Sequence, residues 1–162
     1  MGARPFTSRW GFDISVDFDR VQLRARDRRW FLRLFRLIGV LAEVGPGDVH
    51  VAIVRDAAMR RLHRTYLRQD STTDVLTFDM RDAPEEPIHG DVVVNLDEAQ
   101  RQARKRGHDL RLELMLYAVH GLLHLQGYDD RTEEDAAEMH LREDTLFKAA
   151  GLPAIYHSQP PG

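Results

Sequence analysis

The segment from Leu110 to Gln126 constrains the fold more than any other part of the chain. Apolar side chains occupy nearly every side of the helix that this segment predicts, whereas a surface helix keeps one polar face. A helix without a polar face has to be surrounded by other elements, so we expect it at the centre of the core. Asp109 is placed to cap its first turn, and the chain turns after Gly127.

The periodicity elsewhere predicts the elements that surround this helix. Apolar residues at alternating positions predict strands over 12–18, 49–53, 74–78 and 90–94. Three- and four-residue spacing predicts helices within 19–44, after a cap at Asp56, over 97–106, and from a capping box at Thr132 to Ala150. The expected fold class is α+β: a single domain in which a small mixed four-stranded sheet packs with about five helices around the central apolar helix.

Length and composition exclude several classes of protein. A chain of 162 residues suits one domain, which we expect over 1–157 with a disordered tail over 158–162. The absence of cysteine excludes a disulfide framework, a Cys-ligated zinc finger, an iron–sulfur cluster and a thiol nucleophile, so any metal must bind histidine or carboxylate. No apolar run approaches the roughly 18 residues of a membrane span, and the first ten residues lack the apolar core of a signal peptide. We therefore expect a cytoplasmic protein that has no membrane contact.

Two histidines interrupt the apolar helix at a spacing that suits a metal ion. His120 and His124 are four residues apart, so both imidazoles project from one face, although a bare pair of this kind is as often two core histidines. Gly127 can adopt a positive φ, reverse the chain and return Asp130 as a third ligand. Three protein ligands leave a position for water, which is typical of catalytic zinc. The sequence thus predicts a metal at His120, His124 and Asp130, with metal-bound water as the reactive group.

Other residues are candidates for roles beside this metal. Gly121 stands where metalloproteases of the H-E-x-x-H type carry their general base, which argues against a peptidase. We interpret this glycine as room for a substrate backbone to approach the metal. His140 is a rival third ligand, but its distance of sixteen residues from His124 matches no familiar motif. No general acid stands out, because Asp74, Asp91 and His89 are equally plausible as turn or strand-end residues.

Residues 120–130 read H-G-L-L-H-L-Q-G-Y-D-D. They resemble the signature H-G-x-L-H-L-x-G-Y-D-H of the YbeY family, bacterial metal-dependent endoribonucleases of ribosomal RNA maturation. Residues 62–78 are similar to the family pattern L-N-x-x-Y-R-x-x-D-x-x-T-D-V-L-S-F, and 90–94 to its strand G-D-I-x-I. Residues 138–153 are similar to its closing helix and G-L-P ending, so the resemblance covers about 49–153.

The resemblance implies a function and a set of partners. It implies a single-strand-specific endoribonuclease that uses one zinc ion per chain. It also implies action on ribosomal RNA at the small subunit, in 3′ end maturation and ribosome quality control. Two alternatives stay open: a metal-dependent hydrolase of another substrate, and a non-enzymatic ribosome assembly factor with a structural metal. The sequence gives no indication of the oligomeric state or of protein partners.

The chain departs from the family pattern at two positions. The third ligand position of the family is histidine, whereas this chain has Asp130, and a carboxylate shifts the preference toward harder divalent ions than zinc. The family also places an arginine, thought to contact RNA, directly after a tyrosine. That position is Leu67 here, so Arg68, one residue later, is the candidate for binding substrate instead; the alternative is that it is a solvated charge at the helix end.

The net charge of -3 conceals an uneven distribution of charge along the chain. Segments 20–36, 55–68 and 101–111 are strongly basic, whereas 127–146 is acidic. If the three basic segments converge around the metal, they form a groove for phosphate groups. The mild acidity of the whole chain therefore does not exclude a nucleic-acid substrate.

Overall fold

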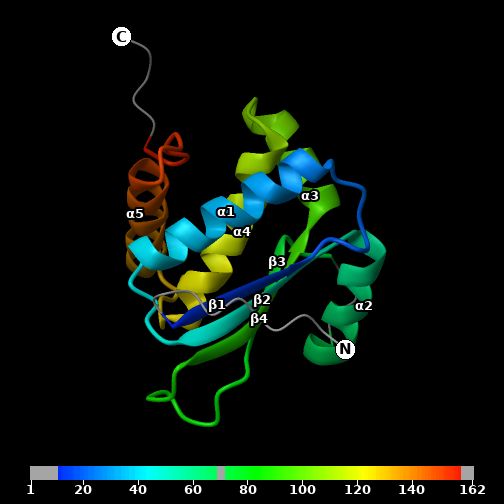
Figure 1. The fold of residues 1–162 in the computed structure, drawn as a ribbon. Helices are drawn as coiled ribbons and strands as arrows, with labels where there is room; N and C mark the ends of the chain where they lie inside the picture. The colour runs from blue at the N-terminus through cyan, green and yellow to red at the C-terminus, as the bar shows by residue number, and fades with distance from the viewer. Residues whose placement is uncertain (1–10, 69–71, 158–162) are drawn as a thin grey trace.

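Four strands of alternating apolar residues form one mixed sheet in the order β1-β2-β4-β3 (Figure 1). The computed structural model describes residues 11–68 and 72–157. β1, β2 and β4 run parallel, and β3 pairs antiparallel with β4 along one edge. The strands are β1 (Phe12–Asp17), β2 (Gly47–Val54), β3 (Val75–Asp79) and β4 (Ile88–Asn95).

Five helices complete the predicted α+β fold, within a single domain. They are α1 (Ala25–Leu41), α2 (Asp56–Leu67), α3 (Leu96–Arg106), α4 (Leu110–Leu125) and α5 (Glu133–Ala149). The disordered tail expected over 158–162 lies outside the described residues. Within 11–68 and 72–157, none of the helices is both long and apolar enough to cross a membrane.

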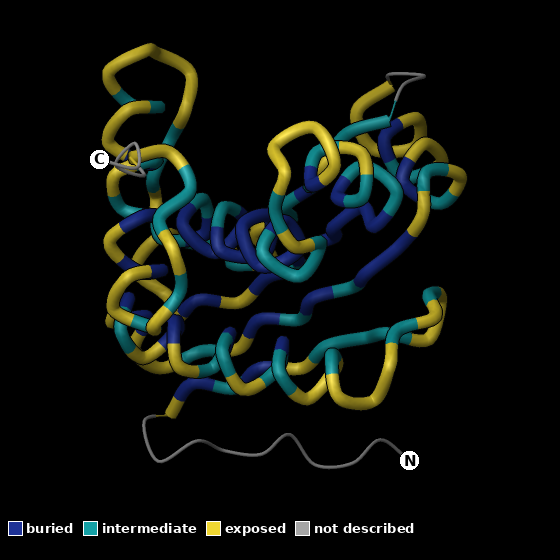
Figure 2. Tube along the Cα trace, turned by 90° about the horizontal axis from the view of Figure 1, so that it is seen from above, coloured by how far each residue is buried: buried dark blue, intermediate teal, exposed yellow. Residues whose placement is uncertain are grey.

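The predicted central position of α4 is confirmed. From Glu113 to Leu125 the helix is buried at every position except His120 and His124, which are partly exposed. α4 packs on the sheet through β3 and β4, and it also contacts α1, α3 and α5 (Figures 1 and 2). Along the last three turns of this helix, His120 and His124 are therefore the only residues that solvent reaches to a sizeable extent.

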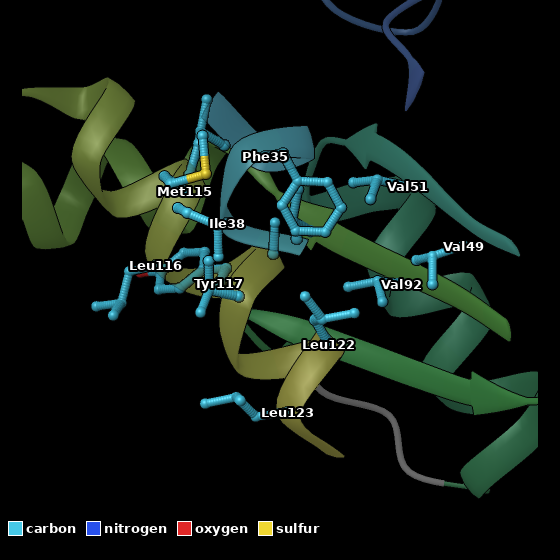
Figure 3. Packing of buried hydrophobic residues seen from close by; sticks show 14 of the residues in the cluster. Phe35, Ile38, Val49, Val51, Val92, Met115, Leu116, Tyr117, Leu122 and Leu123 are labelled. Carbon is cyan, nitrogen blue, oxygen red and sulfur yellow. The ribbon is translucent and has the colours of Figure 1, made fainter. Parts of the chain in front are cut away.

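The sheet separates two apolar clusters. α1 and α4 cover one face, where Phe35 of α1 and Leu122 of α4 pack close to Val51 and Val92 of the strands (Figure 3). α2 covers the opposite face, where Met59 is fully buried. Because successive strand residues point to opposite faces, one apolar β4 run supplies both clusters.

Two of the three predicted helix caps are confirmed. The side chains of Asp109 and Thr132 each accept a hydrogen bond from a backbone N–H in the first turn of their helix. The prediction for Asp56 is wrong, because Arg55 holds the N-cap position of α2 and Asp56 is the first helical residue. The Asp56 carboxylate instead accepts two hydrogen bonds from the guanidinium of Arg101 on α3, at 2.8 Å each. The Asp56 side chain, which the local sequence pattern assigns to a helix cap, thus forms a tertiary ion pair with Arg101 instead.

Gly121 serves the packing of α4 on the sheet, and our interpretation of it as room for substrate is wrong. A Cβ atom at this buried position would lie 2.4 Å from Cγ1 of Val92 and 3.1 Å from Oγ1 of Thr77. Both neighbours belong to strands of the sheet, so the missing side chain faces away from solvent. The glycine lets the helix that carries both histidines lie directly against β3 and β4.

We expect the substitution Gly121→Ala to lower the free energy of unfolding by about 1–3 kcal/mol, because the added methyl overpacks the interface between helix and sheet. Urea unfolding measures this change. The double variant Gly121→Ala with Val92→Ala removes the two methyl groups that the new Cβ meets, so it should lose less stability than the sum of the single variants. Strict additivity would contradict this account of the glycine.

Candidate metal centre

The structure brings His120, His124 and Asp130 together. One ligand atom of each lies within 4.8 Å of the other two. The Nε2 atoms of the two imidazoles are 3.1 Å apart, and Oδ2 of Asp130 lies 3.2 Å from Nε2 of His120 and 3.7 Å from that of His124. These side chains meet because the helix spacing aligns the histidines and the following turn returns the carboxylate.

The turn after α4 has the conformation that the glycine predicted. Gly127 adopts φ +100°, which an L side chain rarely tolerates, and the chain reverses there. The same turn aims the carbonyl of Tyr128 at Nδ1 of His124, 3.0 Å away. Because a carbonyl oxygen only accepts hydrogen bonds, Nδ1 of His124 donates, and its Nε2 presents a lone pair to the cluster.

Glu143 of α5 supports His120 from the other side, and the sequence analysis missed it. Its side chain is fully buried, and its Oε1 lies 3.4 Å from Nδ1 of His120 and 3.4 Å from Nδ1 of His140. The signal in the sequence is its place on the stripe of α5 that also carries the buried Met139 and Phe147. A charged residue at such a position requires a partner in the interior.

The rival third ligand, His140, does not enter the group formed by the two histidines of α4 and Asp130. It lies beside Glu143 in the wall of the adjoining pocket. Burial lowers the pKa of His120, but the carboxylates of Glu143, Asp130 and Asp74 outweigh this effect and raise the pKa above its ordinary value. The negative potential that favours a proton on this imidazole also favours a metal cation.

The donor set and its spacing suit a divalent metal ion. Zinc binds imidazole nitrogen and carboxylate oxygen at about 2.0–2.2 Å, which places neighbouring tetrahedral ligands roughly 3.3–3.6 Å apart. The three separations of 3.1, 3.2 and 3.7 Å lie close to that range. Two nitrogens and one carboxylate are also suitable ligands for harder divalent ions than zinc.

Two pockets flank this cluster and meet at it. The α5 pocket, of about 510 Å³, lies between α3, α4 and α5. The β3 pocket, of about 490 Å³, lies between the edge strand β3 and the end of α4. Both have Thr73, Asp74, His120 and Asp130 in their walls. The candidate metal centre therefore lies where the two pockets meet, and we call the two pockets together the groove.

A buried hydrogen-bond network, also missed from the sequence, holds the segment that carries Asp74. Asn95 ends β4, is fully buried, and donates from its side-chain amide to Oδ1 of Asp56 and to the hydroxyl of Thr72. Its backbone N–H donates to the carbonyl of Asp74. The network thereby fixes the entry to β3 beside the ends of β2 and β4. Of the three acid candidates, Asp74 lies in both pocket walls, whereas His89 and Asp91 lie in neither.

The arginine-rich segments do not converge on the groove. Arg106 is the only arginine among the described residues that line either pocket. Arg55 forms an ion pair with Asp97, and Arg111 forms one with Asp109. Arg101 pairs with Asp56 and with Glu98, a residue of the α5 pocket wall. The expected phosphate groove of three basic segments is therefore wrong in this form, because the described walls of the two pockets contain one arginine and the three arginines above pair with acidic residues of the fold.

The departure from the family arginine lies directly in the groove. Leu67, the last residue of α2, lines the β3 pocket although its side chain is largely exposed. Arg68 follows it in the left-handed conformation, at φ 54°, and is exposed outside both pocket walls. An apolar side chain thus occupies the wall position, and the cation lies one residue beyond it.

Comparison with known proteins identifies the family. The family described as Endoribonuclease YbeY matches residues 15–151. The chain belongs to the YbeY family. A YbeY endoribonuclease of Moorella thermoacetica is 40% identical over 118 residues, which cover 67% of this chain and 76% of that protein. The one from Geobacillus kaustophilus is 33% identical over 152 residues and covers 86% and 97% respectively.

Two further comparisons concern a longer relative and a solved structure of lower sequence identity. The YbeY endoribonuclease of Myxococcus xanthus is 38% identical over 143 residues, and the match spans only 48% of that longer protein. The solution structure of TM1509 from Thermotoga maritima superposes with a TM-score of 0.62 at 24% identity, covering 86% of this chain and 88% of that one. At that identity the superposition supports the fold alone.

Asp144, the neighbour of Glu143, fixes the C-terminal segment against this site. Its carboxylate is almost fully buried and accepts hydrogen bonds from the backbone N–H groups of Ile155, Tyr156 and His157 at 2.7–3.1 Å. Burial alone raises the pKa of Asp144, but these hydrogen bonds to the charged form outweigh it and lower the pKa below its ordinary value of 3.8. The charged carboxylate therefore stabilises the folded state.

We expect Asp144→Asn to lower the free energy of unfolding at pH 7 by about 1–3 kcal/mol. Because the folded-state pKa lies below the unfolded value, this stabilisation is complete above about pH 3.8 and is lost as the pH falls through the lower, folded-state value. Urea unfolding should show that the difference in the free energy of unfolding between wild type and variant decreases below that pH. The exposed Glu138→Gln on the same helix is the control, and a pH-independent gap would contradict the assignment.

Proposed function

We propose that this protein is an endoribonuclease, the activity named for its YbeY relatives, and that it depends on a metal ion and cleaves single-stranded RNA. The observation that carries the proposal is the cluster of His120, His124 and Asp130 where the two pockets of the groove meet. A groove that continues on both sides of the cluster suits a polymer cleaved internally rather than a small substrate. The resemblance to the family supports ribosomal RNA of the small subunit as substrate, with action in 3′ end maturation and ribosome quality control in the cytoplasm.

His120, His124 and Asp130 would hold one divalent ion, which we propose to be zinc, with harder ions admitted by the carboxylate. When bound, such an ion polarises a phosphoryl oxygen and lowers the pKa of water. The protein contributes the orientation of the ligands. The Tyr128 carbonyl holds His124, and the buried Glu143 holds His120, so neither imidazole has to reorganise when it binds the ion.

Other residues of the groove would hold the RNA strand and move a proton. Arg106 in the wall of the α5 pocket supplies a cation for a phosphate group, and we assign the same role to Arg68 beside the β3 pocket. Asp74 borders the cluster from both pockets, and its Oδ1 accepts the N–H of Val75 at 2.8 Å. We assign to this carboxylate the acceptance of a proton from the attacking nucleophile.

The purified protein should contain about one metal ion per chain, and it should cleave a single-stranded precursor of small-subunit ribosomal RNA until a chelator is added. Asp130→Ala and His124→Ala should each lose metal and cleavage. His140→Ala should retain the metal, because that histidine lies outside the ligand group. The exposed His89→Ala is the matched control and should retain both metal and activity.

Three outcomes would contradict the proposed metal ligands, the proposed RNA substrate or the enzymatic role. If Asp130→Ala leaves metal occupancy unchanged, the ligand set is wrong. If metal binds but precursor RNA is never cut, the site belongs to a hydrolase of another substrate. If chelation lowers the melting temperature while His124→Ala still restores ribosome maturation in a deletion strain, the metal is structural and the protein is an assembly factor.

Asp74→Asn should lower kcat by about 10²–10⁴-fold while metal occupancy and melting temperature stay unchanged. The amide oxygen of Asn still accepts the Val75 N–H, so the entry to β3 is preserved and only the proton acceptor is lost. Asp91→Asn, a carboxylate outside both pockets, is the control. A kcat within threefold of wild type would remove Asp74 from the mechanism.

A further inference from the structure

The α5 pocket contains an aromatic pair that metal binding does not explain. The imidazole of His140 and the ring of Tyr156 stack with centroids 3.8 Å apart and an interplanar angle of 27°. Both residues line the pocket, and Tyr156 is 37% exposed, a large fraction for an aromatic residue anchored to the core. Flat rings of this kind are the surfaces on which proteins stack unpaired nucleobases.

This aromatic surface is held in place by buried charges. Asp144 accepts the backbone N–H of Tyr156, and Glu143 contacts the imidazole of His140. The guanidinium of Arg106 lies 5.7 Å from the centre of the Tyr156 ring and 3.4 Å from the fully buried Glu113. Contacts from α3, α4 and α5 thus fix the rings from several directions. A surface fixed in this way is ready to bind without reorganisation.

The polar groups of the pocket indicate which bases it would accept. The wall contains four carboxylates and a single arginine, Arg106; the carboxylates are those of Asp74, Glu98, Asp130 and Glu143. The Oε2 atom of Glu143 and the hydroxyl of Tyr117 are buried and form no hydrogen bond with any described residue. Carboxylates repel phosphate groups and accept hydrogen bonds from N–H donors. Adenine, guanine and cytosine each carry an exocyclic amino group with two N–H donors. Uracil has only its ring N3–H, which lies between two carbonyl oxygens that a carboxylate repels.

We propose that the α5 pocket binds one unstacked nucleobase of the RNA strand and favours bases with an exocyclic amino group over uracil. The pocket volume of about 510 Å³ falls within the roughly 300–1,000 Å³ of small-ligand sites. His120 and Asp130 form part of the same wall, so the bound base belongs to a nucleotide next to the phosphate at the metal. This inference rests on the proposed function and adds a selectivity for sequence to it.

A binding experiment tests the pocket independently of catalysis. Fluorescein-labelled single-stranded 2′-O-methyl RNA is titrated with metal-loaded protein, and each base in turn is replaced by an abasic nucleotide. At one position the abasic change should weaken binding about tenfold or more, and uracil should bind more weakly there than the other three bases. Tyr156→Leu should abolish this difference, whereas Tyr156→Phe, which keeps the ring, should preserve it. Leu141→Ala, an exposed residue of α5 outside both pockets, is the matched control.

The outcomes distinguish a failure of the base-pocket proposal from a failure of the proposed endoribonuclease function. The proposal is overturned if no abasic position weakens binding, or if Tyr156→Leu keeps the same base dependence as the wild type. If binding depends on the base as predicted but unmodified RNA is not cleaved, the endoribonuclease function fails and the base pocket stands. If RNA is cleaved, the base preference in kcat/KM should match the preference in binding, and Tyr156→Leu should lower both together.

Discussion

The burial of α4 is the constraint on which the rest of the structure depends. Its leucines and neighbouring apolar residues contribute about 1.5–3 kcal/mol each when they leave water, so the sheet and three helices have to cover almost the whole surface of α4. His120 and His124 remain as the only gap in that cover along its last three turns. The groove, the metal-ligand cluster and both pockets lie at this gap because every other residue of α4 from Glu113 to Leu125 is buried.

Two adjacent buried carboxylates of α5 contact both the metal-ligand cluster and the segment 155–157 that follows the helix. Glu143 faces the histidines, while Asp144 faces the backbone of 155–157 and so sets the position of Tyr156. A charge inside a protein is tolerated only when partners surround it, so each carboxylate fixes the groups that it contacts. The closing helix therefore orients a histidine of the metal-ligand cluster and shapes the pocket beside it.

The two departures from the family pattern act on the charge of the groove. Asp130 adds a negative charge at the cluster, and Leu67 leaves an apolar side chain in the β3 pocket at the position where the resemblance predicts an arginine. Arg106 is the remaining arginine in the described pocket walls, and it lies on the opposite side, toward α5. Under the proposed function, attraction of RNA phosphates in this chain depends more on the bound metal than on arginine.

The sequence by itself determined the features that depend on neighbours within a few turns. It predicted the strands, the buried α4, the cap at Thr132, and the turn at Gly127 that brings Asp130 to the histidines, because periodicity and φ preference are local properties. Only the tertiary structure decided the roles of Glu143, Asn95 and Gly121, and the pairing of arginines with acids of the fold. These depend on which elements become adjacent, and no spacing within one element encodes that adjacency.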